Sequence, residues 1–190
     1  MVSAKDLVLK PISAKKANAV IKALHYSGKV TQNSQLHIGV YWQGKLEGAM
    51  QFGPSLDKRK IQGLVEGTKW NGFLELNRLA FSDRLPKNSE SRALSVAMKM
   101  IKKHKPGVEW IVSFSDGAQC GDGTIYRASG FSLIGIKDNT LWRMPDGKVF
   151  KSLVFDPSVG SKGGVKKKYG KTGSETGISF LKRIGADKMK

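Results

Sequence analysis

The 190-residue sequence predicts an α+β fold, with one domain built on a mixed, mostly antiparallel central sheet flanked by helices. Three observations predict it: short apolar or alternating runs typical of strands, two stretches with apolar residues at helical spacing, and Gly or Pro residues between them. The length suits one domain of about 100–200 residues. We expect this domain to span residues 1–159, followed by a basic Gly/Lys-rich tail at 160–190.

The first 28 residues predict a strand followed by an amphipathic helix. Residues 7–12 form a short apolar-rich run, and Ser13 stands where a helix N-cap is expected. The helix ends near His25, and Gly28 lies just past it, as a stop signal should. Its apolar residues, at i, i+3, i+4 and i+7, are Ala17, Val20, Ile21 and Leu24.

Residues 36–52 predict a hairpin, and a fourth strand follows it. Two strand-like runs, 36–42 and 45–52, are separated by Gln43 and Gly44, and a two-residue connection suits a tight turn between antiparallel neighbours. The polar stretch 54–72 leaves room for one helical turn. Residues 73–81 then alternate apolar and polar side chains, as expected of a half-buried strand.

A long helix and several shorter elements complete the prediction. The helix extends from Asn88 or Ser89 to about Lys103, with an apolar stripe on one face, and Pro106 and Gly107 end it. The remaining elements are an apolar strand, a short helix and closing strands, at residues 110–114, 123–129, 131–136, 141–144 and 149–155.

Charge is the most unusual property of the composition. The chain carries 33 Lys and Arg against 15 Asp and Glu, a formal net charge of +18. Such an excess repels itself in a compact protein, and the simplest partner is a polyanion that releases its counterions, so we expect duplex DNA. We expect no membrane association, because the sequence has no long apolar run or signal peptide. The single cysteine, Cys120, fits a reducing compartment such as the (host) cytoplasm.

From Gly160 onward the sequence is rich in Gly, Ser, Thr and Lys. Residues 162–190 hold nine Lys and Arg against two acids, and few apolar residues remain, so we expect a tail that is disordered when free. It is either a solvated terminus or an arm that contacts DNA. Phe180 and Leu181 could instead dock onto the body. The candidate DNA contacts are Lys166, Lys167 and Lys168.

Several short blocks of the chain resemble the phage Mom family. They are His25-Tyr26-Ser27-Gly28, the run from Glu75 to Phe81, the helix start Asn88-Ser89-Glu90-Ser91-Arg92-Ala93, the segment Ser113-Phe114-Ser115-Asp116, and Tyr126 with Gly130-Phe131. The order of elements also resembles the GCN5-related N-acetyltransferase (GNAT) fold. Together the blocks are far more specific than any one alone, and they cover residues 5–155.

The resemblance implies an enzyme that converts adenine in duplex DNA to a carbamoylmethyl derivative at its exocyclic amine, which shields phage DNA from host restriction. It implies splayed fourth and fifth strands and a helix whose free N–H groups face a pyrophosphate. Acetyl-CoA or a related acyl donor is the cofactor it suggests, while a metal requirement and a homodimer stay open. One departure is the usual glycine-rich phosphate loop, which Pro86–Arg92 replaces; Glu90 there is a poor neighbour for a pyrophosphate.

Five residues are candidates for catalysis. Asp116 follows the strand 110–114 at its carboxyl end and is the candidate for proton handling, unless it merely caps the next turn. Arg78 lies inside a strand, where a guanidinium needs an anion from DNA, donor or protein. His25 could be a base, an orienting group, a metal ligand or a simple cap, and Tyr26 could stack on a flipped base. Tyr126 is either a proton donor or a core tyrosine.

Donor binding is assigned to the end of the strand 73–81 and to the start of the long helix. Ser91 would offer a hydroxyl to a phosphate or carbonyl, or else cap the helix. Arg92 would supply a cation for an anionic donor. The full set is Leu79, Phe81, Asn88, Ser89, Ser91 and Arg92.

Two other functions stay open. A CoA-dependent acyltransferase that acts on a protein or a small amine would form its product without DNA. A non-catalytic basic DNA-binding protein would use Arg78 and Asp116 as a structural pair.

Overall fold

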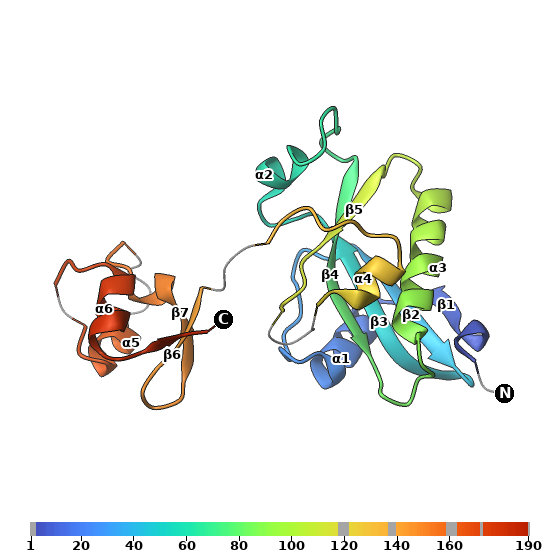
Figure 1. Cartoon of the computed structure of the whole chain (residues 1–190). Helices are drawn as coiled ribbons and strands as arrows, with labels where there is room; N and C mark the ends of the chain where they lie inside the picture. Colours follow the sequence, from blue (N-terminus) through green and yellow to red (C-terminus); the bar gives the residue numbers. More distant parts are fainter. Residues whose placement is uncertain (1–2, 118–121, 137–139, 159–162, 172, 190) are drawn as a thin grey trace. The chain divides into compact units, whose positions relative to one another are not determined.

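The computed structural model describes residues 3–117, 122–136, 140–158, 163–171 and 173–189 (Figure 1). The chain divides into two compact units, residues 1–132 and 133–190, and not at the expected position between residues 159 and 160. The first unit comprises η1 (Ala4–Asp6), β1 (Val8–Pro11), α1 (Ala14–Leu24), β2 (Leu36–Trp42), β3 (Lys45–Gly53), α2 (Lys58–Gln62), β4 (Phe73–Phe81), α3 (Ser89–His104), β5 (Trp110–Ser113) and α4 (Thr124–Ala128). The second comprises β6 (Leu141–Arg143), β7 (Val149–Lys151), η2 (Ser152–Phe155), α5 (Gly163–Lys168), α6 (Gly177–Arg183) and β8 (Asp187–Lys188).

The first unit is built on a five-stranded sheet of order β1-β2-β3-β4-β5. The first three strand pairs are antiparallel and the last, β4 with β5, is parallel. Gln43 and Gly44 both have positive φ, 49° and 77°, which matches the twist of a two-residue hairpin. The prediction of a mixed, mostly antiparallel sheet in an α+β fold is confirmed.

The strands β4 and β5 part halfway along β4. They pair only from Phe73 to Leu76, and residues 77–81 continue beside β3 alone. At the same point the β3–β4 register shifts, because Gln51 pairs with Arg78 but Phe52 pairs with Leu76. One extra residue, Asn77, is therefore accommodated in β4 as a bulge, a feature that bends a strand and redirects its side chains.

Helices cover both faces of this sheet (Figure 1). On one face α1 packs Ala17 and Ile21 against Ala49 of β3 and Ala80 of β4. On the other face α3 closes the main core with Ala93, Leu94, Ala97 and Ile101, over Ile38, Val40, Met50, Phe52 and Leu76. Because successive side chains of a strand point to opposite faces, neighbouring residues of one strand face different helices, α1 or α3.

The second unit has a core of its own. A small antiparallel sheet of order β7-β6-β8 packs with η2, α5 and α6. Phe155, Phe180 and Leu181 are fully buried there, beside Trp142 and Met144. The described part of the expected tail is therefore folded, and Phe180 and Leu181 dock as the sequence allowed. Both residues lie on α6, on the side that packs against Trp142, Met144 and Phe155 in the core of the second unit.

Two of the closing strands differ from the prediction. Residues 131–136 form no strand, and Leu133, Ile134 and Ile136 are 76%, 65% and 87% exposed. An apolar run without a pairing strand or covering helix does not become a strand. In 149–155 only Val149–Lys151 is a strand, and η2 follows. Both β6 and β7 lie in the second sheet, not the first.

No helix in the described ranges is long and apolar enough to cross a membrane.

Candidate functional site

Arg78 lies on the α1 face of β4, opposite Gln51. Its Nε donates to the carbonyl of Lys29 at 3.0 Å, and its Nη1 donates to the carbonyl of Asn77 at 2.6 Å. Across the described residues no carboxylate forms an ion pair with Arg78, and Nη2 has no hydrogen bond. Two anchored nitrogens fix the guanidinium plane, and the third is left to an anion from outside the chain.

His25 ends α1 and lies near Arg78. Its Nδ1 accepts a hydrogen bond from the backbone N–H of Ser27 at 3.1 Å and lies 2.8 Å from the Ser27 hydroxyl. Because Nδ1 accepts, the proton of the neutral ring is on Nε2. Burial, and secondly the positive charge of Arg78, lower the pKa of His25 below its ordinary value. The ring is therefore a neutral N–H donor at Nε2.

Tyr26 stacks on His25, with ring centroids 4.3 Å apart and planes inclined by 29°. Its side chain is 57% exposed. An exposed aromatic ring held by a second ring is a platform on which a flat base could stack.

A buried polar group lies beside Arg78 under α1. Gln51 is fully buried; its Nε2 donates to Asn18 Oδ1 at 2.8 Å and lies 3.3 Å from His37 Nδ1, while its Oε1 has no partner in the described structure. Burial lowers the pKa of His37. Sequence reasoning missed this group, because Gln51 comes opposite Arg78 only through the register of β3 and β4.

Asp116 and Tyr126 lie in the chain segments that follow β5. Asp116 is half-buried in the segment after β5 and forms no ion pair with Arg78, both residues being in the described ranges. Tyr126, on α4, packs edge-on against Phe131 at 5.6 Å and against the core under α3. The structure thus brings His25 and Arg78 together, and the catalytic roles of Asp116 and Tyr126 stay predictions.

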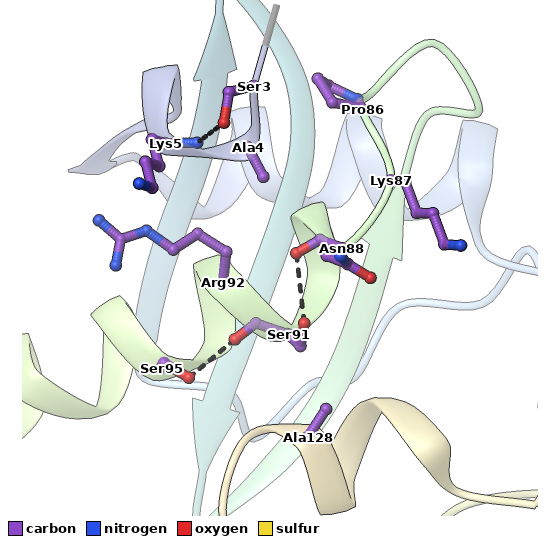
Figure 2. A pocket seen from close by; sticks show the side chains of 10 residues that line it. All are labelled: Ser3, Ala4, Lys5, Pro86, Lys87, Asn88, Ser91, Arg92, Ser95 and Ala128. Atoms are coloured by element: carbon purple, nitrogen blue, oxygen red, sulfur yellow. Dashed lines mark hydrogen bonds between the residues drawn. The ribbon is translucent and has the colours of Figure 1, made fainter.

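A pocket of about 490 Å³ opens at the start of α3 (Figure 2). Three cations line it, Lys5 from η1 and Lys87 and Arg92 around the helix start, and none of the described residues that line it is an acid. Glu90, which looked unfavourable in the sequence, is not among the lining residues. The other lining residues are Ser3, Ala4, Pro86, Asn88, Ser91, Ser95 and Ala128.

The helix start itself presents donors to an anion. Asn88 is in the left-handed region (φ 68°), and its side chain does not cap the helix. Within the described structure the N–H groups of Glu90 and Ser91 have no acceptor, whereas that of Arg92 bonds the Asn88 carbonyl at 3.1 Å. Unpaired N–H groups at the positive end of a 16-residue helix favour an anion.

The predicted donor residues divide into two groups. Asn88, Ser91 and Arg92 line the pocket. Ser89 is fully buried and donates its hydroxyl to the Pro86 carbonyl at 2.6 Å, so it shapes the turn before the helix. Leu79 and Phe81 pack against the core under α3. Sequence reasoning missed Lys5 and Lys87, and Lys5 could be found only from the tertiary structure, because it is distant in sequence from α3.

Arg78 and the pocket that contains the candidate donor residues lie toward opposite faces of the sheet. Arg78 and Gln51 are on the α1 face with Ala80 and Ala49, two residues away along their strands. The pocket lies at the start of α3, the helix of the other face. The parting of β4 from β5 beyond Leu76 leaves a break in the sheet between the two.

The three tail lysines are not equivalent. Lys166 Nζ donates to the Asp156 carbonyl at 2.6 Å, and Lys168 Nζ lies 3.8 Å from Asp146 Oδ2. Lys167 is exposed. Cys120 lies outside the described residues, and within them no group of three or more His, Cys, Asp or Glu could hold a metal ion.

A model of the Mom protein family matches residues 6–183. The chain belongs to this family. Methylcarbamoylase mom of Escherichia phage Mu is 38% identical over 153 residues, which cover 80% of this chain and 63% of that protein. The chain therefore matches just under two thirds of this Mom relative's length, and the resemblance predicted from the sequence blocks is confirmed.

Solved acetyltransferase structures are among those similar to the chain. AAC(6')-Iy, in complex with the bisubstrate analog CoA-S-monomethyl-acetylneamine, has a TM-score of 0.51 at 11% identity, over 69% of this chain and 94% of that chain. The aminoglycoside acetyltransferase AAC(6')-Ib, in complex with coenzyme A, has a TM-score of 0.47 at 15% identity, over 75% and 91%. The first likeness shows the fold alone, which is GNAT-like as predicted.

Proposed function

We propose that this Mom family member is a transferase that converts adenine in duplex DNA to its N6-carbamoylmethyl derivative and so protects phage DNA from host restriction. The observation that carries the proposal is family membership over residues 6–183, together with the relative named methylcarbamoylase. The net charge of +18 supports a polyanionic substrate.

The reacting amine sets what the protein must do. The exocyclic nitrogen of adenine is a weak nucleophile, and it is stacked and paired in a duplex, so the base must leave the stack. The exposed Tyr26 ring would receive the extruded base by stacking. The Nε2–H of His25 and the free Nη2 of Arg78 would then bind acceptor atoms of the base, or a flanking phosphate.

His25 is a hydrogen-bond donor in this proposal, not a base. Accepting a proton at Nδ1 would break the bond from the Ser27 N–H, and Nε2 already carries its proton. The proton that leaves the adenine amine therefore needs another acceptor, and Asp116, at the carboxyl end of β5, keeps that role as a prediction.

The pocket at the start of α3 would hold the phosphates of an acyl-CoA. Lys5, Lys87 and Arg92 and the unpaired N–H groups of α3 fit such an anion, and the lining residues that the structure describes include no acid. When bound, a thioester supplies an activated acyl carbon. A carbamoylmethyl group is joined to nitrogen through its methylene carbon, so simple acetyl transfer does not yield it, and binding and donation need separate tests.

Expression in a bacterial host tests the proposed activity. DNA from expressing cells is digested to nucleosides and analysed by mass spectrometry, with Arg78→Gln as the matched control. We expect an adenine nucleoside that is heavier by one carbamoylmethyl group with the parent chain, and none with the variant. Unmodified adenine with the folded parent chain would refute the activity.

The second candidate is a CoA-dependent acyltransferase of a protein or small amine, which the fold and the anion pocket favour. It predicts acetyl-CoA turnover in the absence of DNA. Turnover that requires duplex DNA would exclude it.

A further inference from the structure

The second unit carries more positive charge than its own structure uses. Residues 133–190 hold 13 Lys and Arg against 5 Asp and Glu, a net charge of +8 in 58 residues. A solvated surface usually mixes the two signs, since an excess of one sign opposes compaction. Some of these cations form hydrogen bonds or ion pairs within the unit, and the others remain for a partner.

Several cations of this unit are structural. Lys171 is 7% exposed, and its ammonium donates to the Glu175 carbonyl at 2.8 Å. Lys166 is bonded to the Asp156 carbonyl. Arg183 forms a 2.7 Å ion pair with Glu175. These groups hold the folded chain together and are not available to a partner.

Two further lysines, Lys148 and Lys168, lie at a single acid, Asp146. Asp146 accepts from the Tyr169 hydroxyl at 2.8 Å and from the backbone N–H of Lys148 at 3.2 Å, and the Lys168 ammonium lies 3.8 Å from it. Lys148 and Lys168 thus meet at Asp146, one through its backbone N–H and the other through its ammonium, and the interaction of the two side chains lowers the pKa of Lys168 and raises that of Lys148. One carboxylate thus stands against the charges of two lysines, and the group keeps a net positive charge at the surface.

We propose that Lys148 and Lys168, held by Asp146, form a binding site for the phosphate backbone of duplex DNA, which anchors the second unit to the substrate. Two crowded ammonium groups gain from a phosphate because it relieves their mutual repulsion, and each releases condensed counterions from the duplex. The site carries no base-edge recognition of its own, so it fits any sequence. The inference rests on the proposed function for its choice of duplex DNA.

The test compares variants of the full chain by DNA affinity over a series of salt concentrations. The paired variant is Lys148→Gln with Lys168→Gln. Its control, Lys99→Gln with Lys103→Gln, removes the same charge from the exposed side of α3. We expect the slope of log K against log salt to fall by about 1.8 in the paired variant, at about 0.9 per phosphate contact, and by clearly less in the control.

For a third variant we expect a gain in DNA affinity, which a loss of folding could not produce. Asp146→Asn keeps an acceptor for the Tyr169 hydroxyl and removes the charge that offsets the lysine pair. We expect tighter DNA binding at low salt, by roughly 2- to 10-fold, and a slope that steepens by up to about one unit. Circular dichroism checks that each variant is folded.

Three outcomes would overturn the proposal: equal slopes in the paired variant and its control, unchanged affinity in Asp146→Asn, or a paired-variant effect on anionic lipid vesicles equal to that on DNA. The adenine modification assay separates this inference from the proposed function. If the paired variant changes the salt slope but the parent chain does not modify adenine, the phosphate site is supported and the proposed activity is refuted. If adenine is modified but the paired variant and its control have equal slopes, the activity is supported and the phosphate site is refuted.

Discussion

The backbone N–H of Ser27 donates to Nδ1 of His25 at 3.1 Å and thereby places the proton of the neutral ring on Nε2. Two residues of one turn therefore settle whether a histidine at this site gives or takes a hydrogen bond.

Replacing His25 by Gln should be tolerated better than replacing it by Asn. A Gln amide reaches the position of Nε2 with an N–H donor, whereas an Asn amide mimics only Nδ1. We expect Gln to retain about 10-fold more modification activity than Asn, and His25→Ala to lose about 100-fold. Rates on a duplex oligonucleotide decide between them. Equal losses in Gln and Asn would instead favour a base or a metal ligand.

The pKa of His25 predicts a pH profile. Since burial and Arg78 lower this pKa below 6.5, the ring of the folded protein stays neutral just below pH 6.5, and activity is lost as the pH falls through the lowered value. The free energy of unfolding decreases between pH 6.5, where the unfolded chain takes up its proton, and the lowered value. Proton NMR of the ring, assigned with His25→Gln, measures it. In Arg78→Gln the titration should move upward while staying below 6.5, because burial remains. A titration at or above 6.5 in the parent chain contradicts the prediction.

Arg78→Lys should behave as a loss of function although the charge is kept. A lysine cannot donate to the carbonyls of Lys29 and Asn77 and still present a third fixed donor. We expect a decrease in kcat of about 100-fold with an unchanged melting temperature to within a few degrees. Thermal denaturation is the control, and a rate near that of the parent chain would show that only charge matters.

The pocket at the start of α3 predicts the binding of acyl-CoA. Lys87→Gln with Arg92→Gln should weaken acetyl-CoA binding by at least about 100-fold, since each charge-assisted hydrogen bond contributes about 1.5–3 kcal/mol. Calorimetry measures it, and Lys99→Gln with Lys103→Gln is the charge-matched control. If the double variant and its control bind acetyl-CoA equally well, this pocket is not the binding site of the donor. Carbon-labelled acetyl-CoA then tells whether its carbons reach the adenine.

Gly53 should not tolerate a side chain. A Cβ there would lie 2.5 Å from the Asn33 carbonyl and 2.8 Å from Asn77 Oδ1, at the bulge of β4. We expect Gly53→Ala to lower the free energy of unfolding by about 1–3 kcal/mol. Gly63, whose nearest atom would be 3.6 Å away, is the matched position and should change stability little. Urea denaturation compares the two variants.

Local patterns in the sequence predicted most of the fold. The hairpin at Gln43-Gly44, the strand 73–81 and the long helix from Ser89 were predicted with nearly their observed ends, because turn residues and periodicity act over a few positions. Residues 131–136 were misread because whether an apolar run pairs depends on a distant strand. The second unit was missed for a similar reason: Phe180 and Trp142 are 38 residues apart, and their contact is tertiary.

The candidate site was predicted in part. His25, Arg78 and the start of α3 followed from sequence blocks. Lys5 joins the pocket from η1, and Gln51 meets Arg78 only through strand register, so neither could be read from its neighbours. The three lysines at 166–168 are indistinguishable in the sequence. Only the folded structure shows that Lys166 forms a structural hydrogen bond while Lys168 lies beside Asp146.

The division of the site between the two faces of the sheet has a kinetic consequence. Under the proposed function, a used carrier could depart from the α3 side while the duplex stays in place on the α1 side, and a fresh carrier could enter behind it. Several adenines of one DNA molecule would then be altered in a single encounter, so that heavily marked and untouched molecules coexist early in the reaction.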